Sequence, residues 1–195
     1  MTPKIVFATG NEGKMKEVRA ILSDLGLPVL SMKEAGISLD IVEDGTTFAQ
    51  NAMIKAKAVH AACGEIVLAD DSGLEVDAMN REPGIYSARW MGEDTSYLVK
   101  NAAIIERLNG LSGAERSARF VCAIAAVFPD GQTAESYGTI EGEIAHEPAG
   151  AGGFGYDPIF WLPERGMTTA ELTPEEKNAV SHRGNALRMM AEIMN

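Results

Sequence analysis

The stretch KIVFATGNEGKMKEVRAIL, residues 4–22, contains a strand, a glycine-containing loop and a helix in direct succession. The apolar residues 4–8 predict a short buried strand. After Lys14 the apolar residues recur at helical spacing, which predicts a helix that Gly26 ends. A strand joined to a helix by so short a loop indicates an α/β protein.

The same alternation continues along the chain. Further strands are expected over residues 28–32, 65–70, 117–128 and 133–145, and further helices over residues 47–63, 95–110, 173–177 and 185–194. The turn residues 129–131, Pro-Asp-Gly, make a hairpin of the last two strands. We interpret residues 1–195 as one α/β domain with a mixed twisted sheet and flanking helices, in which the central hairpin allows two lobes.

The composition excludes several classes of protein. The chain of 195 residues is 46% apolar and has a net charge of −11. So acidic a surface repels the phosphate backbone, so we expect no nucleic acid polymer as a partner. Two cysteines and three histidines argue against a disulfide framework and a zinc cluster. The sequence shows neither a signal peptide nor an apolar run of about 18 residues that could span a membrane, so we expect a cytoplasmic protein.

The loop after the first strand is a candidate anion site. Its glycines at positions 10 and 13 allow a ligand to come close, and the helix that follows directs N–H groups and the positive end of its dipole at one point. Lys14 adds a charge, and Thr9 and Asn11 add hydrogen bonds. The spacing differs from that of a Walker A loop. A plain strand-to-helix turn explains this stretch at least as well.

Asp70 and Asp71 stand at the expected end of the strand over residues 65–70. Ligands of open α/β sheets bind at the carboxyl ends of strands. Two adjacent carboxylates repel each other unless a proton or a cation intervenes, and Mg²⁺ prefers such oxygen ligands together with phosphate oxygens. Glu43, in the loop IVEDGTTF (41–48), is either a further metal ligand or a solvated charge.

Two later stretches carry groups that suit a nucleotide. GAGGFG, residues 150–155, has the glycine spacing of a dinucleotide-binding loop, but it follows no expected strand and opens no helix. We interpret it as a loop that carries Phe154 and Tyr156, either for stacking on a base or as buried anchors. Lys177, His182 and Arg183 suit a base and phosphates, although lone His and Arg residues are usually structural or solvated.

Five motifs follow one another across nearly the whole chain: ATGNEGKMKEV, ADDSGLEV, PGIYSARW, GGFGYDPIF and SHRGNAL. Together they closely resemble the inosine/xanthosine triphosphate pyrophosphatase family. The resemblance implies an elongated α/β fold with two lobes around a central nucleotide-binding cleft, usually as a homodimer. It also implies Mg²⁺-dependent hydrolysis of purine nucleoside triphosphates (ITP, dITP and XTP) to the monophosphate and pyrophosphate, which keeps inosine and xanthine out of DNA and RNA.

The same resemblance implies roles for individual residues. Asp71 would be the catalytic carboxylate, as general base or metal ligand, and Asp70 and Glu43 would support the metal. The triphosphate would be held by Thr9, Gly10, Asn11, Glu12, Gly13 and Lys14. The other substrate contacts would come from Lys55, Ser72, Phe154, Gly155, Tyr156, Asp157, Lys177, His182 and Arg183.

Base selection has a simple physical logic. Inosine and xanthine carry a carbonyl acceptor at C6 where adenine carries an amino donor, so donors from His182 or Arg183 would discriminate against ATP, while Phe154 would stack on any base. A phospho-accepting receiver domain also has an acidic pair at a strand end, but it leaves the GFGYDP and SHRG segments unexplained. A related pyrophosphatase that acts on pyrimidine or modified nucleotides is the second alternative.

Overall fold

The computed structural model describes residues 3–195, and their contacts divide the chain into two compact units. The first unit comprises residues 3–71, 122–138 and 182–195, and the second comprises residues 72–121 and 139–181. Each unit has its own cluster of buried apolar side chains. Because each unit is assembled from segments that are far apart in sequence, each core closes only when distant parts of the chain meet.

The described residues form one mixed sheet with the strand order β2-β1-β3-β5-β6-β7-β8, and β4 pairs with β3. The strands are β1 (Ile5–Phe7), β2 (Val29–Ser31), β3 (Ile66–Val76), β4 (Glu82–Pro83), β5 (Ser117–Val127), β6 (Thr133–Ile144), β7 (Phe160–Leu162) and β8 (Met167–Thr168). β1 runs parallel to β2 and β3, whereas β4 and β7 pair antiparallel to their neighbours. The predicted mixed α/β sheet is confirmed.

Five α-helices accompany the described strands: α1 (Glu12–Ile21), α2 (Phe48–Cys63), α3 (Tyr97–Arg107), α4 (Pro174–Val180) and α5 (His182–Met194). Most of them begin at a side-chain cap that satisfies a first-turn N–H group. Thr47 accepts from the N–H of Gln50 at 3.2 Å, and Thr173 forms a capping box with Glu176 at the start of α4. None of the described helices is both long and apolar enough to cross a membrane.

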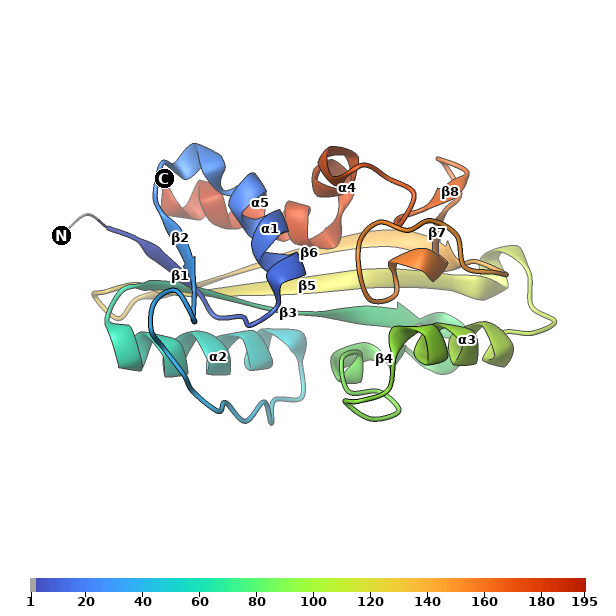
Figure 1. Cartoon of the computed structure of the whole chain (residues 1–195), viewed down its shortest axis with the longest axis horizontal. Helices are drawn as coiled ribbons and strands as arrows, with labels where there is room; N and C mark the ends of the chain where they lie inside the picture. The colour runs from blue at the N-terminus through green and yellow to red at the C-terminus, as the bar shows by residue number, and fades with distance from the viewer. Residues whose placement is uncertain (1–2) are drawn as a thin grey trace. The chain divides into compact units, whose positions relative to one another are not determined.

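In the first unit, α1 and α5 lie on one side of the strands and α2 lies on the other (Figure 1). The core between them contains apolar side chains from the strands and from α1 and α5, including Phe7, Met15, Leu68, Ile124 and Leu187. The loop of residues 37–47 leads into α2 without regular secondary structure. Both faces of this part of the sheet are therefore covered by helices, as expected for a parallel arrangement.

The second unit packs α3 against its own strands. Its core includes Leu74, Val76, Ile104, Phe120 and Phe160, and the rings of the last two are 4.4 Å apart between centroids. These five residues come from four elements, β3, α3, β5 and β7.

One predicted strand end is wrong. A strand that ends at the Asp70-Asp71 pair was predicted, but β3 continues without interruption to Val76. Alternate residues beyond the pair, Leu74 and Val76, are fully buried in the core of the second unit, which keeps the chain extended. The predicted hairpin of β5 and β6 is confirmed, with a turn in which the N–H of Phe128 donates to the carbonyl of Gln132 at 2.9 Å.

Candidate active site

The loop between β1 and α1 is shaped by two short-range hydrogen bonds. Thr9 Oγ1 accepts from the N–H of Asn11 at 3.1 Å, and Asn11 Oδ1 accepts from the N–H of Lys14 at 3.1 Å. The first-turn N–H groups that precede Lys14 have no acceptor within an α-helix. A Cβ atom added to Gly10 would meet no atom within 4 Å, so the space in front of the loop is open. The loop therefore offers N–H groups and open space to an anion.

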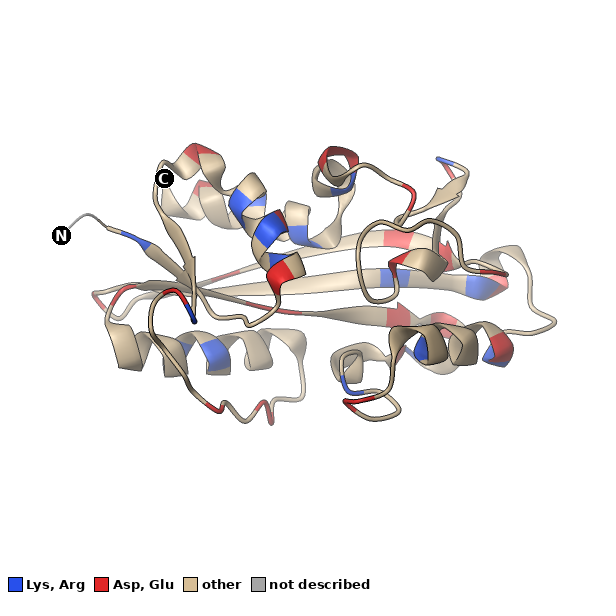
Figure 2. Cartoon of the chain, in the orientation of Figure 1, with Lys and Arg blue, Asp and Glu red and all other residues tan. Residues whose placement is uncertain are grey.

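Asp70 lies on the face of β3 that α1 and α5 cover. Lys14 Nζ lies 3.0 Å from its Oδ1 and 2.9 Å from its Oδ2, and Arg183 donates to Oδ2 from Nε at 3.3 Å and from Nη2 at 3.2 Å. Basic positions of α1 and α5 gather where these two helices lie side by side (Figure 2). Burial alone would raise the pKa of Asp70, but the two cations outweigh burial and hold this pKa well below its usual range. Asp70 therefore stays ionised.

Asp71 lies on the opposite face of β3, toward α2. Its Oδ1 is 3.6 Å from Lys55 Nζ, and its Oδ2 accepts from Asn51 Nδ2 at 3.2 Å. Lys55 also donates to Glu43 Oε2 at 2.9 Å, so one ammonium lies between two carboxylates. Burial, together with the charge of Glu43, raises the pKa of Asp71 to about 6 in spite of Lys55. Of the two aspartates, Asp71 is the one that can exchange a proton near neutral pH.

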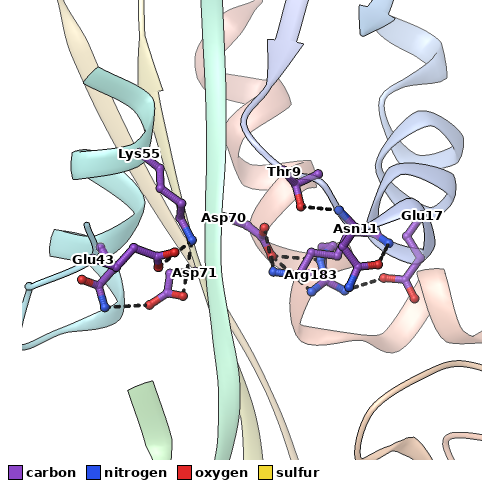
Figure 3. Close-up of polar contacts among 10 residues, drawn as sticks. Thr9, Asn11, Glu17, Glu43, Lys55, Asp70, Asp71 and Arg183 are labelled. Carbon is purple, nitrogen blue, oxygen red and sulfur yellow. Dashed lines mark hydrogen bonds and ion pairs between the residues drawn. The ribbon is translucent and has the colours of Figure 1, made fainter. Parts of the chain in front are cut away.

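Figure 3 shows the two neighbouring aspartates on opposite sides of β3. Successive side chains of a strand point to opposite faces, so an uninterrupted strand separates Asp70 from Asp71. The register of β1 with β3 ends at the pair Phe7 and Leu68, so both aspartates lie just beyond the part of β3 that β1 covers. The carboxyl end of β1, rather than the end of β3, marks the position of the site.

Asn51 connects the loop that carries Glu43 to Asp71. Its Oδ1 accepts from the N–H of Gly45 at 2.9 Å, while its Nδ2 donates to Asp71. A Cβ atom at Gly45 would lie 2.6 Å from Asn51 Oδ1, so this close approach requires glycine. The amide of Asn51 therefore fixes the backbone two residues after Glu43.

Asp71 and Glu43, which both approach the ammonium of Lys55, are the carboxylates that we would assign to Mg²⁺. This ion commonly uses one or two carboxylates and completes its shell with water and phosphate oxygens. Within residues 3–195 no group of three or more His, Cys, Asp or Glu side chains could hold a metal. Two carboxylates, Asp71 and Glu43, share the ammonium of Lys55, and such a pair fits an ion that takes its other ligands from water and phosphate. Asp70 was also expected to support the metal; that expectation stays a prediction, and its contacts here are with Lys14 and Arg183.

In the second unit, Asp157 holds the GGFGYDP loop (residues 152–158) in shape. Its Oδ2 accepts from the N–H of Phe154 at 2.8 Å and from Lys177 Nζ at 2.7 Å, and its Oδ1 accepts from Thr169 Oγ1 at 2.8 Å. A Cβ atom at Gly153 would lie 2.2 Å from Asp157 Oδ2. The carboxylate of Asp157 is buried, so its side chain shapes the loop from inside.

The two aromatic residues of this loop differ in exposure. Tyr156 is buried: its hydroxyl donates to the carbonyl of Ser87 at 2.7 Å, and its ring meets that of Tyr97 at right angles with centroids 5.1 Å apart. Phe154 is half-buried, and Lys177 Nζ lies 4.7 Å from its ring centroid. Phe154 is therefore the ring that retains surface for a ligand.

The predicted site residues come together as two groups, one in each unit. The group in the first unit is Thr9, Lys14, Glu43, Lys55, Asp70, Asp71 and Arg183, and the group in the second is Phe154, Gly155, Tyr156, Asp157 and Lys177. Ser72 follows Asp71 in β3, and His182 is buried at the start of α5. Arg183 was expected to offer donors to a base, but its guanidinium is buried and donates to Asp70 and Glu17. A buried cation requires such anionic partners.

The sequence model of the Ham1 family matches residues 5–193. The chain belongs to the Ham1 family. A dITP/XTP pyrophosphatase of Desulforamulus reducens is 47% identical over 98% of this chain and 96% of its own length. A dITP/XTP pyrophosphatase of Bacillus subtilis is 43% identical over 97% of this chain and 96% of its own length. The resemblance found from the sequence motifs is confirmed.

Solved Ham1 structures also match the fold. A HAM1 protein from Coxiella burnetii has a TM-score of 0.89 at 40% identity, covering 99% of this chain and 98% of that one. The Ham1 protein of Staphylococcus aureus has a TM-score of 0.86 at 41% identity, covering 98% and 97%. The mixed α/β fold of this chain is thus the Ham1 fold.

Three contacts of this Ham1 protein were missed from its sequence. Asn51 precedes Lys55 by four residues, and Glu17 follows Lys14 by three, so each shares a helix face with a predicted site residue. That spacing was a usable signal. Thr169 contacts Asp157 from a separate loop, and nothing in the local sequence indicates this contact.

Proposed function

We propose that the protein hydrolyses ITP, dITP and XTP to the nucleoside monophosphate and pyrophosphate, with Mg²⁺ as cofactor. The observation that carries the proposal is the arrangement of Asp71, Lys55 and Glu43 on one face of β3, with Asp70 and Lys14 on the other. Membership of the Ham1 family and relatives named dITP/XTP pyrophosphatase support this substrate class. The biological task would be to keep deaminated purines out of DNA and RNA.

The loop of residues 9–14 would hold the triphosphate. Lys14 keeps 18% of its side chain exposed although its ammonium contacts Asp70, so it is the cation of this cluster that a ligand reaches. The open space at Gly10 admits a phosphate group to the backbone N–H groups of the loop. Lys14 would then neutralise part of the charge that develops on the leaving pyrophosphate.

Asp71 would carry the proton transfer. The water that attacks at the α–β linkage must lose a proton, and a carboxylate whose pKa is raised to about 6 is a suitable acceptor near neutral pH. Lys55 and Asn51 orient this carboxylate. In its alternative role Asp71 would be a ligand of Mg²⁺ together with Glu43, and the ion would neutralise charge on the phosphate oxygens.

The second unit supplies the groups proposed for the base. Phe154 would stack on the purine, because of the two rings in its loop it is the one that is only half-buried. Tyr156 and Asp157 would support that loop through their buried contacts with Ser87 and Lys177. With Arg183 engaged by carboxylates, His182 remains our candidate donor for the C6 carbonyl.

Two further expectations remain proposals. We propose a homodimer, on the strength of the resemblance, and a cytoplasmic location, on the strength of composition. Sedimentation equilibrium of the purified chain tests the first, and fractionation of cells that produce the native protein tests the second.

The activity is tested by incubating the protein with ITP, dITP, XTP, ATP, GTP and CTP in Mg²⁺ and measuring pyrophosphate and monophosphate. We expect the three deaminated purines to be preferred and the products to be equimolar. EDTA and the Asp71→Asn variant are the controls: EDTA should abolish product, and the variant should form it at least about 10²-fold more slowly. Preference for CTP would favour the pyrimidine alternative, and release of orthophosphate would contradict cleavage at the α–β linkage.

A further inference from the structure

Four charged side chains form a continuous series on the α1 and α5 side of β3. Glu17 on α1 accepts from Arg183 on α5, Arg183 donates to Asp70 on β3, and Asp70 accepts from Lys14 on α1. The two side chains in the middle of the series, Arg183 and Asp70, are 2% and 1% exposed, whereas Glu17 and Lys14 at its ends are 13% and 18% exposed. Only the last cation of the series has appreciable access to a ligand.

We propose that Asp70 is a positioning residue that holds the ammonium of Lys14 in place for the triphosphate, with Arg183 fixing Asp70 from behind. This inference rests on the proposed function, because it concerns how the same site binds its substrate. It gives Asp70 a task different from that of a metal ligand.

The contact geometry supports this division. Lys14 Nζ lies within 3.0 Å of both oxygens of Asp70, so the carboxylate fixes the ammonium from two directions. A lysine side chain otherwise has four flexible bonds and a strongly hydrated charge. Ordering it before the ligand arrives lowers the entropy that binding would have to overcome.

The backbone around Arg183 is packed tightly against β6. A Cβ atom at Gly138 of β6 would lie 2.1 Å from the carbonyl oxygen of His182 and 2.6 Å from the N atom of Ala186, so the first turn of α5 lies directly on β6. Arg183 starts from this fixed turn and reaches both Asp70 and Glu17. The carboxylate that holds Lys14 is therefore fixed by a rigid neighbour.

Positioning by Asp70 and simple charge counting predict opposite effects of Asp70→Asn on the affinity for an anion. Asp70→Asn removes a negative charge next to a phosphate site, and charge counting alone predicts tighter anion binding. Positioning predicts weaker binding, because Lys14 and Arg183 lose the group that orders them. Asp71→Asn removes the same charge from the next residue without touching this series, so it is the matched control.

The experiment measures binding of inorganic tripolyphosphate by calorimetry in EDTA, so that neither metal nor turnover contributes. We expect about tenfold weaker binding or more for Asp70→Asn, and equal or tighter binding for Asp71→Asn. Equal or tighter binding by Asp70→Asn overturns the proposal. Hydrolysis of ITP by the wild type is measured separately, so the proposed function can fail while this difference in binding persists.

Two further measurements cover misfolding and the metal. If Asp70→Asn does not fold, Glu17→Gln decides the matter. This change removes the charge that pairs with Arg183 and should weaken tripolyphosphate binding by a few-fold, whereas unchanged affinity overturns the proposal. Addition of Mg²⁺ alone should raise the thermal unfolding temperature of the wild type, and that of folded Asp70→Asn by a similar amount. Loss of that response in Asp70→Asn would make Asp70 a metal ligand and overturn the positioning role.

Discussion

Replacing Asp71 by asparagine should remove activity and at the same time stabilise the metal-free protein. The pKa of Asp71 is about 6 in the folded chain against an ordinary value of 3.8, because the carboxylate is buried near Glu43. This difference of about 2.2 units corresponds to about 3 kcal/mol by which ionisation of Asp71 destabilises the folded state. Asparagine approximates the neutral acid in shape and carries no charge, so we expect the variant to gain about 1–3 kcal/mol at pH 8.

The dependence on pH follows from proton binding. Well below pH 3.8 the folded and unfolded chains both hold the proton, so Asp71 contributes nothing. As the pH rises from 3.8 to about 6, the unfolded chain releases its proton first, and the free energy of unfolding of the wild type falls. Above that range the loss is constant. The advantage of Asp71→Asn should therefore be full at pH 8 and about a third of that at pH 4.5.

The assay is urea denaturation of both proteins in EDTA between pH 4.5 and 8. Carboxylates common to the two proteins cancel in the difference, which isolates Asp71. Mg²⁺ should stabilise the wild type and leave the variant unchanged, and kcat for ITP should fall by about 10²-fold or more. A variant that is less stable than the wild type at pH 8, or a difference that does not change with pH, would refute this reasoning.

Three further substitutions separate binding from folding. Gly10→Ala should leave the unfolding midpoint unchanged, since a Cβ there meets nothing within 4 Å, and should weaken tripolyphosphate about tenfold; a lower midpoint would contradict the open loop. Phe154→Ala should lower kcat/KM for ITP, XTP and ATP by similar factors of about ten, because every base has a π-face, and an effect on one nucleotide alone would rule out simple stacking. Asp157→Asn breaks a buried ion pair with Lys177 and should lower the free energy of unfolding, measured in urea, by about 3 kcal/mol. Thr169→Val, which removes only a hydrogen bond to Asp157, is the control and should have a smaller effect. An unchanged free energy of unfolding in Asp157→Asn would show that the pair is dispensable.

The order of the main elements could be predicted because their signals are local. Helical spacing after Lys14, the cap at Thr47 and the capping box of Thr173 and Glu176 all act within a few residues. β4, β7 and β8 were missed because they have two, three and two residues, too few for an alternation to be visible. Their pairing depends on partners supplied by the fold.

The site residues stay predictions, and the sequence indicated only part of the arrangement that the structure gives them. The separation of Asp70 from Asp71 depended on where β3 ends, and the buried Leu74 and Val76 beyond the pair contained that information. The contact of Asp70 with Arg183 was not predictable, because 113 residues separate them and no local pattern links the two.

One strand thereby supplies two aspartates of opposite electrostatic character. Asp70 faces Lys14 and Arg183, which hold its pKa low, whereas Asp71 shares the single ammonium of Lys55 with Glu43 and keeps a raised pKa. A carboxylate that orders a cation must stay ionised, while one that accepts a proton must bind it at an accessible pH. These requirements conflict in a single environment. Because side chains alternate along β3, the two adjacent aspartates lie in two different environments, and each requirement is met by one of them. Two aspartates that look equivalent in the sequence are therefore not interchangeable in the fold.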